Sequence, residues 1–407
     1  MKKILTFLFF CTSLYSYSQS ISASQLKSDI KYFSSDKQKG RATGSKQEQE
    51  VAIFISKRFE KLGLQPRGKN GSFLYPFHFK KSLNIHDTTG GKDWTGTNVI
   101  GYLNNQAEQT VVIGAHFDHL GLGEDGNSLQ PDAKGKIHNG ADDNASGTAG
   151  VLALANYFTK NNKTEKFNFL FICFSGEELG LIGSKKYCEE PTIDFSHVNY
   201  MINLDMIGRL NDSTKKLMIY GVGTAKEWVP LLNEVNGHFN IKKDSSGVGP
   251  SDQTSFYLKN IPVLHFFTGQ HHDYHKPSDD FKKINFTGEQ EILEYIIQLI
   301  EKTETLPKFT FQLTKNTNPE IRTFKVTMGV MPDYSFEGTG MRIDAVTSGR
   351  PAEKAGLKAG DIVIKMEDRT ITNLNDYMKA LYVFEKGQTI KVIILRDKNE
   401  LKLNVTF

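Results

Sequence analysis

Short apolar runs alternate with helix-like segments through the middle of the chain. The runs NVIGYL, TVVIGA, FNFLFICF, VNYMINLDM, KLMIYGV and IPVLHFF lie within residues 98–267, and helical patterns follow Ser146, Gly180, Thr224 and Gly288. Continuous apolar runs of this length are typical of strands buried on both faces, and their alternation with helices is typical of parallel sheets. The pattern therefore predicts an α/β fold in which helices flank a mixed, mostly parallel sheet.

Helical patterns also precede and follow this region. From Val51 onward, Ile55 and Phe59 recur on one face, and a second apolar helix begins at Glu289 and ends near Thr305. The segment LPKFTFQLTKNTNPE that follows is polar and contains prolines, so we predict a linker over residues 306–322. A second small unit follows over residues 323–407.

The first residues have the order of a secretory signal. Lys2 and Lys3 precede an apolar run that ends near Tyr15, and small polar residues follow up to Ser18. The run is too short for a membrane helix, which needs about 20 apolar residues. We predict a signal peptide over residues 1–18 and a mature chain without a transmembrane segment. The protein is then exported, to the periplasm or to the medium.

Composition narrows the remaining classes. The 407 residues are 38% hydrophobic and 24% charged, which is ordinary for a globular protein and excludes disordered and collagen-like chains. A formal net charge of +4 argues against a protein that coats nucleic acid, so no nucleic-acid partner is expected. Beyond the signal peptide only Cys173 and Cys188 remain, too few for a disulfide-built scaffold. Whether these two pair is left open.

Acidic and histidine side chains gather in the loops that follow the predicted strands. These loops read GAHFDHLG, HNGADDNASG, SGEELG, NLDMIG and, further along, HHDYHKPSDD. Carboxylates brought into one cleft repel each other unless a cation neutralises them. Imidazole and carboxylate ligands together suit a catalytic zinc site, and five or more of them can hold two ions. The candidates are His116, Asp118, His119, Asp142, Asp143, Glu177, Glu178, Asp205, His271, His272, Asp273, His275 and Asp279.

The same motifs, in the same order, resemble the secreted co-catalytic zinc aminopeptidases of the bacterial leucyl aminopeptidase and aminopeptidase Y type, relatives of glutamate carboxypeptidase. The resemblance covers roughly residues 24–305 and places the catalytic domain at residues 19–305. It implies the zinc exopeptidase fold and two Zn²⁺ ions as cofactors. The metal ligands that it implies are His116, Asp143, Glu178, Asp205 and His275.

The resemblance also implies a role for each residue. His116 and Asp205 hold one zinc, Glu178 and His275 hold the other, and Asp143 bridges the two. Glu177 is the general base, Asp118 supports His116, and Tyr274 resembles the family's donor to the developing oxyanion. A tyrosine that only packs beside the ligand loop is an equal alternative for Tyr274.

Several neighbouring residues are not assigned as ligands. The family register places the bridge at Asp143, so Asp142 is expected to orient the loop, and no role is assigned to His119 and His138. His271 and His272 could replace His275 as the ligand, and only the spacing to Pro277 and Asp279 favours His275. Gln253 in GVGPSDQTSF stands where the family usually has histidine. Residues 34–45 resemble a loop that reads GRxTGS in many secreted members, and we assign no chemistry to its Arg41.

The C-terminal unit resembles a PDZ domain of the bacterial, protease-linked kind, most specifically in AEKAGLKAGDIVI. The resemblance makes Gly338, Thr339, Gly340 and Met341 the expected carboxylate-binding loop, beside which a peptide adds a strand to an exposed sheet edge. The expected partner is a peptide or the C-terminus of a protein. A module that only packs against the catalytic domain is an almost equal alternative.

The sequence thus predicts an exported zinc exopeptidase that hydrolyses peptide bonds, chiefly as an aminopeptidase. A carboxypeptidase of the same family is an alternative because Arg209 and Lys276 lie near predicted ligands and could hold a substrate carboxylate. A glutaminyl-cyclase-like acyltransferase that uses one zinc is a second alternative. A non-catalytic PDZ scaffold is the third, and the retained Glu177 argues against it.

Overall fold

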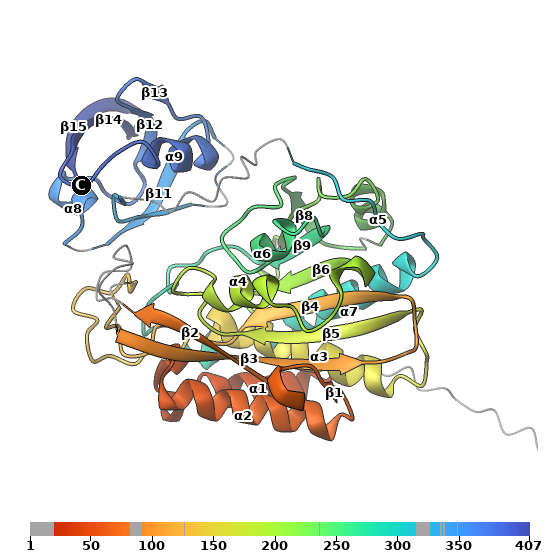
Figure 1. Cartoon of the computed structure of the whole chain (residues 1–407). Coiled ribbons are helices and arrows are strands. Elements are labelled where there is room, and N and C mark those ends of the chain that lie inside the picture. Colours follow the sequence, from red (N-terminus) through yellow and green to blue (C-terminus); the bar gives the residue numbers. More distant parts are fainter. Residues whose placement is uncertain are drawn as a thin grey trace, which may run out of the picture.

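The computed structural model describes residues 20–81, 92–125, 127–235, 237–314, 326–333, 336, 338–347 and 349–407 (Figure 1). The predicted signal peptide lies outside these residues. Two sets of hydrophobic cores divide the described chain: residues between Ile21 and Phe309 pack on a large sheet, and residues between Val326 and Val405 form a separate core. The chain therefore folds as two units.

Nine strands form the sheet of the larger unit in the described chain, in the order β1-β3-β5-β4-β6-β9-β7-β8, with β2 also paired to β3. The central strands β5, β4, β6 and β9 are parallel, and antiparallel pairings join this group to β3 and to β7. The predicted mixed, mostly parallel sheet is confirmed. The strands are β1 (Gln65–Pro66), β2 (Leu74–Lys81), β3 (Lys92–Leu103), β4 (Gln109–His116), β5 (Phe167–Phe174), β6 (Val198–Leu204), β7 (Lys216–Tyr220), β8 (Asn240–Lys243) and β9 (Val263–Phe267).

Helices cover both faces of this sheet (Figure 1). Val111 and Ile113 of β4 pack into a core with α1, α2, α3, α5 and α7, whereas Val112 faces α4 and α6. Both faces of the central strands are therefore buried, which explains their continuous apolar sequences. The helices are α1 (Ala23–Phe33), α2 (Lys46–Lys61), α3 (Gly147–Lys160), α4 (Ile182–Glu189), α5 (Trp228–Val235), α6 (Gln253–Tyr257) and α7 (Phe286–Thr303). Shorter helical turns are η1 (Asp36–Arg41), η2 (Lys69–Gly71), η3 (Ala141–Ser146), η4 (Phe195–His197) and η5 (Phe281–Lys283).

The register of the parallel strands aligns their C-terminal ends. His116, the last residue of β4, lies opposite Phe174, the last residue of β5, and Leu204 at the end of β6 lies opposite Phe266 of β9. Because these strands run in the same direction, the segments that follow them leave the sheet at one edge. Ligand sites in open α/β sheets lie at this edge.

The start of the predicted linker packs along the larger unit. The ring centroid of Phe309 lies 4.8 Å from that of Trp228 and 5.4 Å from that of Tyr200. The N–H of Phe309 donates to Asn199 Oδ1 at 2.8 Å. Residues 306–314 therefore run as an ordered strap over this core.

The described residues of the smaller unit form six strands in the order β10-β11-β12-β14-β15 with β13 beside β12, and two short helices. Its core lies between this sheet and the helix α9. The elements are β10 (Val330–Pro332), β11 (Met341–Val346), α8 (Pro351–Lys354), β12 (Ile362–Met366), β13 (Arg369–Thr370), α9 (Leu374–Leu381), β14 (Thr389–Arg396) and β15 (Asn399–Thr406).

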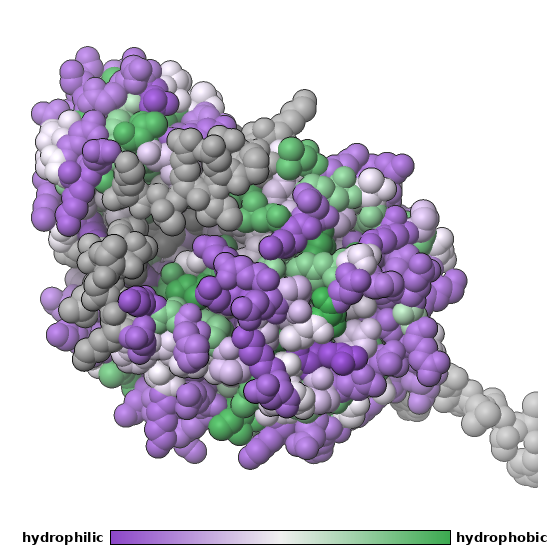
Figure 2. Space-filling model, in the orientation of Figure 1, coloured by the Kyte–Doolittle hydropathy of each residue, from purple (hydrophilic) through white to green (hydrophobic). Residues whose placement is uncertain are grey.

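The surface is largely polar on the face drawn in Figure 2, where apolar residues form scattered small groups. Large apolar side chains that are exposed are few among the described residues, with Leu313 the most exposed at 64%. No described helix combines the length and the apolar character needed to cross a membrane. Cys173 and Cys188 are both buried, and neither forms a disulfide.

Candidate metal centre

The predicted ligands converge at the edge where the parallel strands end. His116 closes β4, Glu178 follows β5, and Asp205 follows β6. Asp143 belongs to the turn η3 that precedes α3, and its peptide bond to Asn144 is cis. His275 comes from the loop after β9 and has a positive φ of 53°. Five separate segments thus deliver one candidate ligand each.

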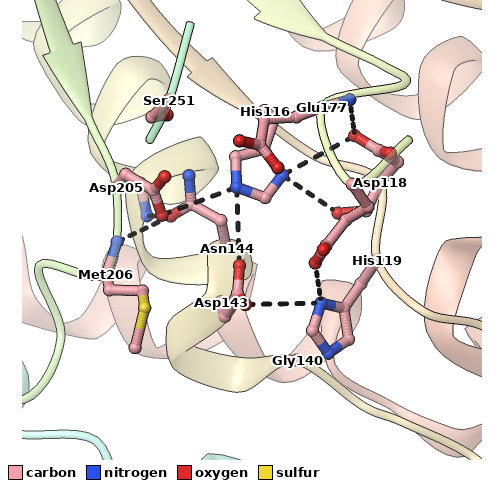
Figure 3. Close-up of polar contacts among 12 residues, drawn as sticks. His116, Asp118, His119, Gly140, Asp143, Asn144, Glu177, Asp205, Met206 and Ser251 are labelled. Atoms are coloured by element: carbon pink, nitrogen blue, oxygen red, sulfur yellow. Dashed lines mark hydrogen bonds and ion pairs between the residues drawn. The ribbon is translucent and has the colours of Figure 1, made fainter. Parts of the chain in front are cut away.

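His116, Asp143 and Asp205 form one group of three candidate ligands (Figure 3). The Nε2 of His116 lies 3.4 Å from Asp143 Oδ1 and 3.5 Å from Asp205 Oδ1. Its Nδ1 lies 3.2 Å from the backbone carbonyl oxygen of Asp118. An Nδ1–H that donates to this carbonyl leaves the Nε2 lone pair free, which is the usual arrangement of a histidine that binds metal.

A second group surrounds His275 with the same arrangement. Its Nε2 lies 3.2 Å from Asp143 Oδ2 and 3.1 Å from Glu178 Oε2. Its Nδ1 lies 2.9 Å from the backbone carbonyl oxygen of Asn127. The two oxygens of Asp143 thus face different histidines, as a carboxylate that bridges two ions requires.

His119, a candidate without an assigned role, also lies beside the second group. Its Nδ1 lies 2.7 Å from Glu178 Oε1 and 3.8 Å from Asp143 Oδ2, so His119, Asp143 and Glu178 form a further set with metal-ligand spacing. Its Nδ1 faces the carboxylate rather than a backbone carbonyl, and it approaches the Glu178 oxygen that is not directed at His275. This geometry fits a hydrogen bond that orients Glu178.

Two buried polar atoms of these groups fit a role as metal ligands. Asp143 Oδ2 and His275 Nε2 have no hydrogen-bond partner among the described residues, although both are buried. Unpaired buried polar atoms are costly in a folded protein. The donors are imidazole nitrogens and carboxylate oxygens, which suit zinc, and no cysteine stands among them.

The charges of this cluster perturb its histidines. Burial lowers the pKa of His116, but the negative charges of Asp205 and Glu177 outweigh burial and raise it well above the ordinary value. The pKa of His275 is likewise raised, chiefly by Glu178 against the effect of burial. The clustered carboxylates therefore favour positive charge at this site, which divalent cations can supply.

The adjacent glutamates differ in their environments. Burial raises the pKa of Glu177 well above its ordinary value, and His116 opposes this shift only in part. Burial acts in the same direction on Glu178, but His275 and His119 outweigh it and lower its pKa well below the ordinary value. Glu178 is thus held as an anion among cations, whereas Glu177 readily takes up a proton.

The segments that carry the ligands are tied to one another. Asp118 Oδ1 accepts from the N–H of Glu177 at 3.3 Å, and Asp118 Oδ2 accepts from Thr43 Oγ1 at 2.7 Å. Asn144 donates to the Leu204 carbonyl at 2.9 Å and accepts from the N–H of Met206 at 3.2 Å. These bonds fix the loops of Glu177, Asp143 and Asp205 relative to each other.

Asp142 orients loops and does not face either group of ligands. Its carboxylate accepts from the N–H of Gly208 at 2.7 Å and lies 3.1 Å from His271 Nε2. Asp279 accepts from the N–H groups of Asp142 and Asp143 at 3.0 Å each. His271 is therefore engaged by Asp142.

The other unassigned histidines point elsewhere. His138 Nε2 lies 2.7 Å from Ser128 Oγ, and burial lowers the pKa of this histidine to about 4. His272 is exposed, and its backbone carbonyl accepts from Lys276 Nζ at 2.7 Å. Asp273 accepts from Lys283 at 2.5 Å and lies 3.5 Å from Arg209.

A narrow pocket opens beside His116. Besides the acidic groups it is lined by an apolar set and a few neutral polar side chains, and no lysine or arginine lines it in the described part of the chain. Tyr274 stacks on His275 with ring centroids 3.9 Å apart. The lining residues are His116, Asp143, Glu177, Asp205, Met206, Pro250, His265, Phe267, Gln270 and Tyr274.

Gln253, which stands in the place of the usual histidine, is buried near Asn203. Its Oε1 lies 3.4 Å from Asn203 Nδ2, which also donates to Ser251 Oγ at 2.9 Å. Gln253 thus belongs to a polar network that runs beneath Asp205 and leaves both groups of ligands complete.

The predicted carboxylate-binding loop of the smaller unit leads into one of its inner strands. Gly338, Thr339, Gly340 and Met341 lead into β11, which already pairs with β10 and with β12. The N–H of Gly340 donates to the Thr372 carbonyl at 2.9 Å. β10 pairs with β11 from Ile343 to Val346, whereas Met341 and Arg342 pair with β12, so the peptide position beside this loop stays a prediction. The strands at the two ends of the sheet order are β10 and β15.

Comparisons with known proteins agree with this geometry. Residues 98–300 match the family model described as peptidase family M28, and residues 309–407 match that of the PDZ domain. A probable leucine aminopeptidase of Arthroderma otae is 33% identical over 174 residues, which are 41% of this chain and 45% of that protein. The match thus spans less than half the length of this curated relative.

Solved structures share the fold of the larger unit. An aminopeptidase from Aneurinibacillus sp. strain AM-1 has a TM-score of 0.55 at 18% identity, over 73% of this chain and 96% of that one. A Bacteroides thetaiotaomicron glutaminyl cyclase bound to N-acetylhistamine has a TM-score of 0.56 at 15% identity, over 70% of this chain and 99% of that one. At these identities the likeness shows the fold alone.

Proposed function

Because the chain belongs to peptidase family M28 and carries a PDZ domain, we propose that it is an exported dizinc exopeptidase that removes N-terminal residues from peptides. The observation that carries this proposal is the pair of histidine–carboxylate groups that share Asp143. In this proposal His116 and Asp205 hold one zinc ion, and His275 and Glu178 hold the other.

Zinc bound at these groups would supply a Lewis acid that polarises the peptide carbonyl and lowers the pKa of water. Glu177 lines the pocket and accepts a proton from the attacking water, then returns it to the leaving amine. Its raised pKa suits this exchange, because a base must both take and release the proton. The Tyr274 hydroxyl is the proposed donor to the oxyanion that develops on the carbonyl oxygen.

The charge of the pocket favours an aminopeptidase over a carboxypeptidase. A substrate carboxylate needs a positioned arginine or lysine. Arg209 lies 3.5 Å from Asp273, and Lys276 Nζ donates to the His272 carbonyl, so both are engaged outside the pocket lining. A free amine needs no such cation, and Met206 and Phe267 suit an apolar first side chain.

Peptide blocking tests this polarity. The mature protein is incubated with an unblocked peptide that begins with leucine and with its N-acetylated and C-amidated forms, with and without chelator, and the products are read by mass spectrometry. We expect cleavage of the free and amidated peptides, none of the acetylated one, and none after chelation. Cleavage that amidation abolishes would establish the carboxypeptidase instead.

Zinc content distinguishes the peptidase proposal from the glutaminyl-cyclase alternative. Elemental analysis should find two zinc ions per chain, and a peptide that begins with glutamine should be shortened rather than cyclised. One tightly held zinc together with loss of ammonia from that peptide would replace the peptidase proposal.

The PDZ unit is proposed to dock a peptide or a protein C-terminus along β10. This strand lies at the end of the sheet order and follows Gly329, whose φ of 73° suits a tight loop. Binding of a random C-terminal peptide library to the full chain tests this, with Val330→Pro as the variant that removes an N–H of this strand. Equal binding by the variant would exclude β10 as the docking edge.

A further inference from the structure

Arg41 is a fully buried arginine whose guanidinium group contacts only backbone carbonyls among its hydrogen-bond acceptors in the described chain. Its Nε donates to the carbonyl of Phe117 at 2.7 Å. Its Nη1 donates to the carbonyls of Phe33 and Asn139, each at 2.7 Å, and its Nη2 donates to that of Gly140 at 3.1 Å. One side chain thus joins three segments that are far apart in the sequence.

Two of these segments carry the candidate ligands. Phe117 directly follows His116, and Gly140 lies three residues before Asp143. The backbone of Arg41 adds a further link, because its carbonyl accepts from the N–H of His119 at 3.3 Å. The relative position of the His116 loop and the Asp143 loop is therefore set from one point.

The charge of Arg41 is also placed near the acidic cluster. Burial lowers its pKa to about 10, and Asp143 is the carboxylate that opposes this lowering most strongly. The group therefore keeps its charge at neutral pH. The other carboxylates that act on it are Asp118, Asp279 and Glu178.

Only arginine offers this set of donors. A planar guanidinium fork presents five N–H groups in fixed directions, whereas a lysine ammonium is a single point with three donors. Lysine at this position would keep the charge but could not reach four carbonyls on three segments. The geometry of the donors, apart from the charge, is thus what the substitution by lysine removes.

We propose that Arg41 is a positioning residue that holds the His116 and Asp143 loops at the separation needed for two zinc ions. The inference rests on the proposed dizinc function. It assigns to the GRATGS segment a task in metal binding, and it places that task on contacts present before any metal binds. Residues that orient metal ligands typically change metal affinity by about 10- to 100-fold when they are replaced.

The test compares Arg41→Lys with Arg58→Lys as a matched control. Arg58 is a partly buried arginine that pairs with Asp29 on α1, and it contacts none of the candidate ligands. Zinc affinity of the folded, zinc-free proteins is measured by competition with a chromogenic chelator, and kinetics are measured at saturating zinc. We expect R41K to bind zinc about 10- to 100-fold more weakly than the wild type. Its kcat should fall by a larger factor than its KM changes, and R58K should match the wild type in zinc affinity and in kinetics.

Each other outcome has a definite meaning. Wild-type protein that holds no zinc would defeat the proposed function itself. Wild-type protein with two zinc ions and an R41K variant within about twofold of its affinity would defeat only the inference on Arg41. If R41K does not fold, the proposal is tested on the zinc-free wild type by NMR, which measures how fast the Nε–H of each arginine exchanges with water. An Arg41 Nε–H that exchanges with water as fast as that of Arg209 would overturn the proposal.

Discussion

Replacing Glu177 by glutamine tests the assignment of the base most directly. Glutamine has the same shape, and the backbone N–H that donates to Asp118 is unchanged, so the loop should keep its position. The variant loses only the ability to take a proton from water. General bases contribute about 100- to 10,000-fold to such reactions, which corresponds to roughly 2.7–5.4 kcal/mol of the activation barrier.

The same substitution should not weaken the metal site. Glu177 is repelled by Glu178, Asp205 and Asp252, so loss of its charge should leave the zinc-free protein at least as stable as the wild type. We expect kcat of Glu177→Gln to fall by this factor while two zinc ions stay bound, measured by peptide cleavage and elemental analysis on one sample. Glu178→Gln is the matched control at the next residue and should lose zinc. Undiminished hydrolysis by zinc-loaded Glu177→Gln would refute the mechanism, and loss of zinc from it would make Glu177 a ligand.

Two further predictions concern stability. Burial raises the pKa of Glu48 from 4.5 to about 8, so its neutral form stabilises the fold fully below about pH 4.5 and this contribution is lost as the pH rises toward 8. In urea titrations, the free energy of unfolding of Glu48→Gln should therefore fall less steeply with pH than that of the wild type, by up to about 1.4 kcal/mol per pH unit in this window. Equal slopes for the two proteins would contradict the shift. Phe309→Ala removes a ring that packs on Trp228 and Tyr200. It should lower the free energy of unfolding of the larger unit by about 3–5 kcal/mol. A loss below about 1 kcal/mol would mean that the strap over residues 306–314 does not belong to the hydrophobic core of the larger unit.

The sequence contained enough information for the central sheet. Each of its parallel strands is buried on both faces and therefore reads as an apolar run, as FNFLFICF of β5 does. β2 was not predicted from the sequence because it contains Pro76. It pairs with β3 and lies outside the main strand order. Its buried residues Tyr75, Phe77 and Phe79 nevertheless alternate, so a search for period-two patterns could have found it.

The candidate ligands were predictable because ligand chemistry limits the residue types and the sheet fixes where they lie. His116, Glu178 and Asp205 lie at or shortly after the ends of strands that a parallel register must bring together, whereas Asp143 and His275 come from longer loops. The role of His119 was not predictable, since it lies three positions after His116 and only the three-dimensional turn directs its Nδ1 to Glu178. The peptide position on the PDZ unit stays a prediction, because glycines mark tight turns but strand order decides which edge is open.

Arg41 shows where sequence reasoning reaches its limit. Its four acceptors are backbone carbonyls, and a carbonyl is present at every residue whatever its side chain, so the acceptor positions leave no mark in the sequence. The donor is visible but reads as a surface charge, because arginine is seldom fully buried without a paired carboxylate. Removing such a cation from water is expensive, and the cost is offset here by four hydrogen bonds and by nearby carboxylates that themselves need compensation. Two of these carboxylates, Asp143 and Glu178, are also proposed zinc ligands, so the charge of Arg41 lies near the groups whose positions it is proposed to set.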